Sequence, residues 1–103
     1  MPTYYPNKYN VQMHGGPNGY RGKRAIVRLK KDTTAVAYIY FMAGDDPLPN
    51  DDDSGPWIKM YMPESMLPNV VDLIRNESPI KVYFAGGSGF LKCGEEDVGE
   101  EDD

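Results

Sequence analysis

Cysteine and histidine are nearly absent from this chain, which has one of each, Cys93 and His14. A single cysteine excludes a disulfide within the chain, and one cysteine with one histidine cannot make a Cys/His zinc site in one copy. A catalytic triad or a metallohydrolase centre also lacks a histidine, because His14 lies far from any predicted cluster of catalytic residue types. We therefore expect a protein that is not an enzyme and that needs no cofactor.

Long apolar runs are absent as well. The longest, residues 35–43, is too short and too rich in tyrosine to cross a bilayer. The N-terminal residues lack the basic start and the apolar stretch of a secretory signal. These features predict a soluble protein with no membrane partner and a cytoplasmic location.

Helical periodicity is limited to one stretch, residues 65–76. Ser65 is its expected N-cap, and the Ser78-Pro79 pair ends it because a residue before proline disfavours the helical region. Its apolar residues follow the i, i+4, i+7, i+8 spacing of one helical face: Met66, Val70, Leu73 and Ile74. That face is expected to pack on a sheet.

Alternating apolar and polar residues predict five strands. They cover residues 24–31, 34–42, 57–62, 80–84 and 90–93. The order strand, strand, strand, helix, strand, strand predicts an α+β fold, with a mainly antiparallel sheet of about five strands and one helix packed on one face. In the last hairpin, a two-residue turn at residues 87–88 is expected to set Phe84 beside Leu91.

The chain divides into three predicted regions. Residues 1–22 are rich in proline, glycine and asparagine and show neither the helical nor the strand period, so we expect an irregular or disordered N-terminal arm. Residues 23–94 form a single α+β domain. Residues 95–103 form an acidic disordered tail.

Acidic residues are concentrated in a loop at residues 45–53 and in the tail at residues 95–103. These two segments hold twelve of the sixteen acidic residues. The rest of the chain has eleven Lys and Arg against four acids, so it carries +7 while the whole chain carries −5. We interpret the tail as a competitor that lies over a basic surface; the alternative is a solubilising tail without contact.

Aromatic rings and cations alternate on the side of the predicted sheet opposite the helix. Single-stranded nucleic acid is bound by such a pattern, because bases stack on rings while Lys and Arg neutralise phosphates. The candidate nucleic-acid-binding residues are Arg28, Lys30, Tyr38, Tyr40, Trp57, Lys59, Tyr61, Lys81, Tyr83 and Lys92.

The register of the first hairpin decides whether this aromatic and basic face forms. A turn on residues 32–33 alone pairs Arg28 with Ala37 and turns the tyrosines toward the core. A three-residue turn over residues 32–34, or a bulge, instead pairs Arg28 with Tyr38. We favour this second register, because a buried phenol would also need a hydrogen-bond partner.

The leading hypothesis is a small noncatalytic binding domain whose partner is single-stranded DNA or RNA. The alternative is a protein-interaction or self-associating domain that uses the same face, since an exposed aromatic patch also suits a homodimer or another protein partner.

The acidic loop is a weak candidate for calcium, through Asp51, Asp52 and Asp53. Hard cations prefer several oxygen ligands, which these residues supply close together. Their spacing does not match an EF-hand, because Tyr61 falls where the bidentate glutamate should stand. We therefore expect no specific metal site.

Overall fold

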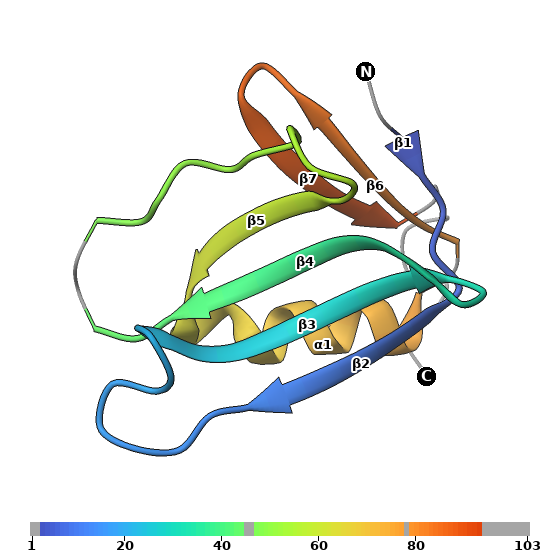
Figure 1. Ribbon diagram of the computed structural model, residues 1–103. Helices are drawn as coiled ribbons and strands as arrows, with labels where there is room; N and C mark the ends of the chain where they lie inside the picture. Colours follow the sequence, from blue (N-terminus) through green and yellow to red (C-terminus); the bar gives the residue numbers. More distant parts are fainter. Residues whose placement is uncertain (1–2, 45–46, 78, 94–103) are drawn as a thin grey trace.

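The computed structural model describes residues 3–44, 47–77 and 79–93. Within these residues, strands form two sheets and one α-helix packs beside them (Figure 1). The elements in chain order are β1 (Thr3–Tyr4), β2 (Lys8–Met13), β3 (Lys23–Lys31), β4 (Thr34–Met42), β5 (Ile58–Pro63), a 3₁₀ turn (Glu64–Met66), α1 (Leu67–Asn76), β6 (Ile80–Ala85) and β7 (Ser88–Cys93).

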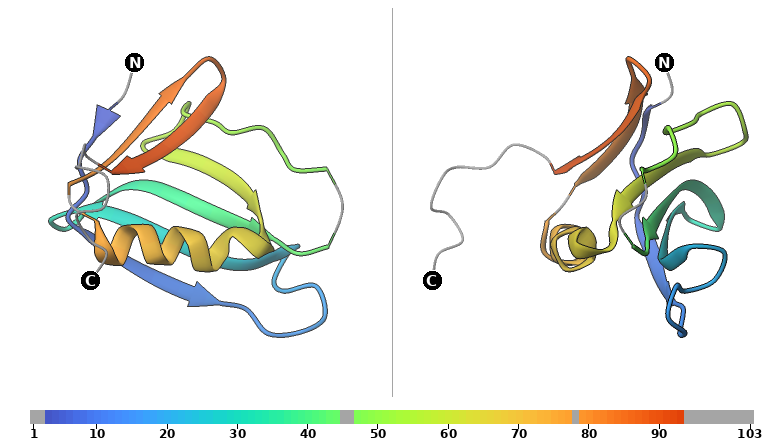
Figure 2. Two further views of the ribbon diagram at one scale, coloured as in Figure 1. Left: turned by 180° about the vertical axis from the view of Figure 1, so that it is seen from behind. Right: turned by 90° about the vertical axis from the view of Figure 1, so that its left-hand side faces the viewer.

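The α+β class and the mainly antiparallel pairing are confirmed, but the single five-stranded sheet is not. One sheet has the order β1-β6-β7 and the other the order β2-β3-β4-β5, in which only β4 and β5 run parallel. The side view in Figure 2 shows α1 and the β6–β7 hairpin on one side of the four-stranded sheet. The prediction missed the second sheet because alternation shows which residues form strands but not which strands pair.

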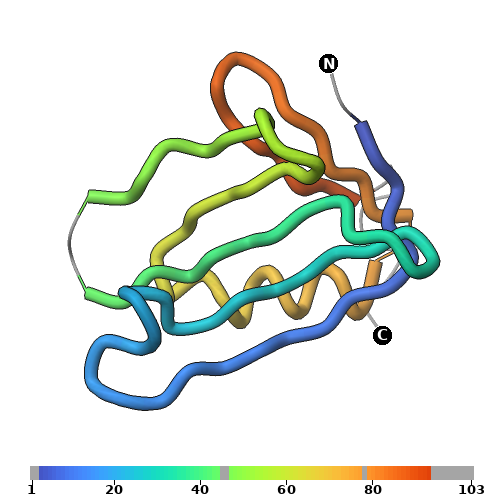
Figure 3. The backbone as a smooth tube through the Cα atoms, in the orientation of Figure 1, coloured from blue at the N-terminus to red at the C-terminus, as the bar shows by residue number. Residues whose placement is uncertain are grey.

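The N-terminal segment is not irregular throughout. β1 pairs with β6, where Thr3 lies opposite Tyr83, and β2 pairs with β3 along its whole length. The tube in Figure 3 follows this one segment from the first sheet into the second. The six residues of β2 do alternate, but proline, glycine and asparagine on both sides hide the pattern, and pairing with β3 fixes the strand. Residues 95–103, the predicted tail, lie outside the described residues.

The β3–β4 hairpin has the preferred register. Arg28 lies opposite Tyr38, although the turn has only two residues and Lys31 pairs with Thr34. A bulge at Val36 supplies the extra residue, so the sheet face is set by a bulge rather than by a longer turn.

The β6–β7 hairpin turns one residue earlier than predicted. Gly86 and Gly87 form its turn, with φ of 59° and 83°, and Tyr83 lies opposite Phe90. The predicted pairing of Phe84 with Leu91 is therefore wrong. A tight hairpin turn favours positive φ at both central residues, which two glycines adopt without strain and a serine does not.

Apolar side chains from both sheets and the helix share one core. Its largest fully buried members are Phe41, Leu29, Ile39, Ile58, Met60, Val27 and Val82. Val70 of α1 is buried in the same cluster, and Leu67 and Ile74 pack against it. The predicted apolar helix face thus has the expected role.

The start of the helix differs from the prediction, although its end at Asn76 agrees. Met66 is the N-cap and makes no side-chain cap, because Ser65 lies within the 3₁₀ turn that precedes α1. Pro68 still falls in the first turn, where a missing N–H costs little. In the part of the chain that the structure describes, no helix is long and apolar enough to span a membrane.

Asp51 and Gly89 form a junction between the two sheets, which we call the β5–β7 junction. One carboxylate oxygen of Asp51 accepts the Tyr61 N–H of β5 at 3.0 Å, and the other accepts the Gly89 N–H of β7 at 2.8 Å. A Cβ at Gly89 would lie 2.3 Å from Cγ of Met60, which is almost fully buried. The close approach of the sheets therefore requires glycine here.

Candidate nucleic-acid interface

Seven of the ten predicted binding residues lie on the side of the four-stranded sheet that faces away from α1. The register explains this grouping, because Tyr38 lies opposite both Arg28 and Lys59, and Tyr40 lies opposite Tyr61. We call this surface the outer face; its predicted members are Arg28, Lys30, Tyr38, Tyr40, Trp57, Lys59 and Tyr61.

Four aromatic rings make a continuous cluster on the outer face. Tyr38 stacks on Trp57 with ring centroids 4.8 Å apart, and Tyr40 stacks on Tyr61 at 5.2 Å. The Tyr38 and Tyr40 rings lie 6.0 Å apart and join the two stacks. The indole Nε1 of Trp57 is buried without a hydrogen-bond partner among the described residues, so packing alone holds this ring. All four residues are half-buried, which gives a firm aromatic platform.

Cations lie over this cluster. The Arg28 guanidinium is 5.5 Å from the centre of the Tyr38 ring, and Lys23 Nζ is 5.2 Å from that of Tyr40. The sequence did not identify Lys23, because simple alternation places it on the core side with Ala25. An irregularity between these two residues reverses that alternation, and nothing in the sequence indicates it.

Strand β2 extends the outer face with residues that the prediction missed. Lys8 lies opposite Lys30, and Asn10 lies opposite Arg28, whose Nη1 donates to Asn10 Oδ1 at 3.3 Å. These residues could have been found only by recognising β2 as a strand, which the predicted irregular arm excluded.

The remaining three predicted residues lie apart from these seven. Lys81, Tyr83 and Lys92 belong to the three-stranded sheet, where Lys81 lies opposite Lys92. The Tyr83 and Phe90 rings stack at 4.9 Å, and Lys81 Nζ is 5.2 Å from the Tyr83 ring. We call these four residues the hairpin patch. The predicted single face is therefore two faces on two sheets.

Few carboxylates accompany the cations of the outer face. Among the described residues the only ion pair joins Arg24 to Glu64, at 3.3 Å. Acids approach the outer face at its β5 edge, where Asp52 bridges to Lys59 through the backbone. Burial, and then the neighbouring Tyr61 and Tyr38, raise the pKa of Tyr40, while Arg28 acts in the opposite direction. Tyr40 therefore stays a neutral phenol at physiological pH.

Two of the three aspartates of the weak calcium candidate have structural partners. Asp51 joins the two sheets, and Asp52 accepts the Ser54 N–H at 2.9 Å and the Ser54 hydroxyl at 3.1 Å. These two hydrogen bonds lower the pKa of Asp52. No group of three or more His, Cys, Asp or Glu residues gathers as a metal site within the described ranges.

Comparisons with known proteins assign neither a family nor a function to the chain. No protein-family model, no curated protein and no solved structure matches the chain significantly.

Proposed function

We propose that the outer face binds single-stranded nucleic acid without catalysing a reaction. The observation that carries the proposal is the continuous cluster of four rings with cations over and beside it. Bases of any sequence stack on aromatic rings, and phosphates are neutralised by Lys and Arg. The ligand class is therefore a flexible strand with exposed bases, read without strong sequence preference.

The charges on the two edges of the sheet give the bound strand an orientation. Lys8, Arg28 and Lys30 lie on β2 and β3, whereas Lys59 of β5 has Asp51 and Asp52 beside it. Phosphates are therefore attracted more strongly to the first edge than to the second. The sugar-phosphate chain then follows β2 and β3 while bases extend toward the rings on β4 and β5.

Opposed lysines also favour an anionic ligand. Lys8 and Lys30 face each other across two strands, and like charges directly opposite one another destabilise a sheet. A phosphate between them would remove that repulsion. In the same proposal the acidic residues 95–103 compete with phosphate for these cations, so removing them tightens binding at low salt.

Titration of labelled single-stranded DNA and RNA tests this function, using the intact chain and a chain ending at Gly94 at two salt concentrations. Lys30→Gln and Lys31→Gln are matched variants, because Lys31 follows Lys30 in β3 but points to the opposite side of the sheet. We expect binding that weakens with salt and tightens on truncation. With Lys30→Gln only, the slope of log binding constant against log salt concentration should fall in magnitude by about 0.7. Equal effects of the two variants would place the contact elsewhere.

Protein interaction or self-association through the same face is the second candidate. It is favoured by the gathering of aromatic residues on the outer face, because Tyr and Trp are enriched where proteins meet. Absence of nucleic-acid binding by either chain, together with an association that Tyr61→Ala abolishes, would support this function instead.

A further inference from the structure

Strand β2 lies at the edge of the four-stranded sheet, and its backbone shows which residues can pair with another strand. Within the described residues β2 pairs only with β3. The His14 N–H donates to the Arg24 carbonyl at 2.8 Å, one step beyond the pair of Met13 with Ala25. Hydrogen-bonded pairs alternate along an antiparallel ladder, so Lys8, Asn10 and Gln12 bond to β3 within β2, while the Asn7 N–H just before the strand also bonds to the Lys30 carbonyl. The backbone N–H and C=O groups of the odd-numbered residues of β2 therefore point outward.

The same odd-numbered residues carry an exposed apolar row. Tyr9 and Val11 are 38% exposed and Met13 is 59% exposed, on the side of the sheet that bears α1. Natural edge strands are usually protected by charges, prolines or bulges, whereas β2 has only Lys8 at its first position. An unprotected edge with an apolar row is suited to pairing with another strand.

We propose that two copies of this chain associate by antiparallel pairing of their β2 strands about Val11. A two-fold axis at an outward-facing residue sets Val11 opposite Val11 of the second copy. Each Tyr9 then lies opposite Met13 of the second copy, so apolar side chains stay on one side. Asn10 falls opposite Gln12 of the second copy, and no two like charges face each other within β2.

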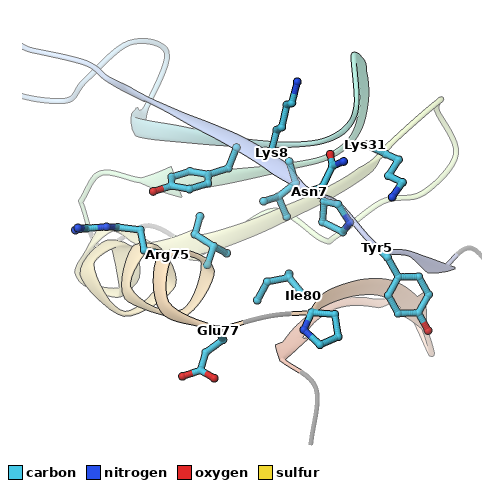
Figure 4. A pocket seen from close by; sticks show the side chains of 12 residues that line it. Tyr5, Asn7, Lys8, Lys31, Arg75, Glu77 and Ile80 are labelled. Atoms are coloured by element: carbon cyan, nitrogen blue, oxygen red, sulfur yellow. The ribbon is translucent and has the colours of Figure 1, made fainter. Parts of the chain in front are cut away.

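A groove beside β2 supports a second copy as the occupant. It has a volume of about 470 Å³ and lies between the start of β2 and the end of α1 (Figure 4). Tyr9 and Ile74 help to line it, while Figure 4 shows Lys8 and Arg75 extending outward from it. Because Met13 of the second copy falls beside Tyr9, its flexible side chain can enter this groove.

This association is independent of the proposed nucleic-acid binding. It uses the edge of the four-stranded sheet, whereas the outer face remains free in both copies. It also differs from self-association through the aromatic rings, which would cover that face.

Sedimentation of the full chain over a range of concentrations measures the association. Val11→Pro removes an outward N–H that the single copy does not use, and proline is tolerated at such edge positions. We expect a concentration-dependent dimer for the natural chain and a loss of the dimer for Val11→Pro, with an unchanged circular dichroism spectrum. A monomer at all concentrations for the natural chain would overturn the proposal.

Disulfide trapping supplies a second readout that does not depend on proline. In a Cys93→Ser background, Val11→Cys sets the two Cα atoms about 5.5 Å apart, within the range of a disulfide. Tyr9→Cys is the matched control, since its two copies stand four residues, or about 13 Å, apart along the strands. We expect covalent dimers with Val11→Cys only. A dimer that survives Val11→Pro and is not trapped at position 11 would contradict the β2 pairing.

Discussion

The outer face and the hairpin patch contain the same kinds of side chain but differ in size. Each has stacked rings, a cation over a tyrosine, and a pair of lysines opposite each other. The outer face extends over four strands and half-buries four rings, whereas the hairpin patch lies on two strands and leaves Phe90 41% exposed. The rings of the outer face therefore form a firm platform, whereas the hairpin patch is a pair of rings with one of them exposed.

The greatest loss of stability is expected from removing the Asp51 carboxylate, which links the two sheets. Asp51→Ala leaves the Tyr61 and Gly89 N–H groups without their carboxylate acceptor and should lower the free energy of unfolding by about 3 kcal/mol. Urea unfolding measures this loss. Asp53→Ala is the control from the same loop, and an equal loss in both variants would show that the loop, not the carboxylate, matters.

Gly89→Ala acts on the same β5–β7 junction by overpacking. The added methyl group would overlap the side chain of Met60, and we expect a loss of about 2 kcal/mol in the free energy of unfolding. Gly55→Ala is the matched control, because a Cβ there meets nothing within 4 Å. If both variants unfold at the same urea concentration, the sheets do not need glycine at this point.

Removing one ring from each surface tests which of the two binds the strand. Tyr61→Ala should weaken single-stranded DNA binding by about 1–3 kcal/mol, the contribution of a stacked base. Phe90→Ala should leave the affinity unchanged, because the hairpin patch lies outside the proposed path of the strand. Fluorescence anisotropy with the same oligonucleotide compares the variants, and a larger loss from Phe90→Ala would assign binding to the hairpin patch.

The smallest expected effect concerns the alkaline stability of the outer face. The pKa of Tyr40 is raised above 10.0 in the folded protein. Its contribution to the free energy of unfolding is therefore complete below the pKa of the unfolded chain and is lost as pH rises through the pKa of the folded protein. Tyr40→Phe should therefore lose less thermal stability than the natural chain above pH of about 10. Tyr5→Phe, at an exposed ring, is the control and should follow the natural chain.

Much of the fold could be predicted because its strongest signals are local. The apolar spacing of α1 and the alternation in β3 and β4 both gave the right elements. Seven of the ten proposed binding residues came together because alternation places residues on one side of each strand and the preferred register sets Arg28 opposite Tyr38.

What could not be predicted depends on single residues that interrupt the alternation or act over a distance. The preferred register allowed either a longer turn or a bulge, and nothing in the sequence places the bulge at Val36. The irregularity beside Lys23 brings an unforeseen cation to the rings. Asp51 looked like one of several loop acids until its two partners, far apart in sequence, were known. The turn at Gly86 was missed because three neighbouring glycines allowed two registers, and only backbone geometry separates them.

The pairing of Thr3 with Tyr83 has a consequence for how the chain folds. It joins residues eighty positions apart, so closing this contact costs more chain entropy than any hairpin in the molecule. During synthesis the β3–β4 hairpin can form while β6 does not yet exist. The first strand must therefore wait until β6 has been synthesised, and we expect the three-stranded sheet to form after the β3–β4 hairpin.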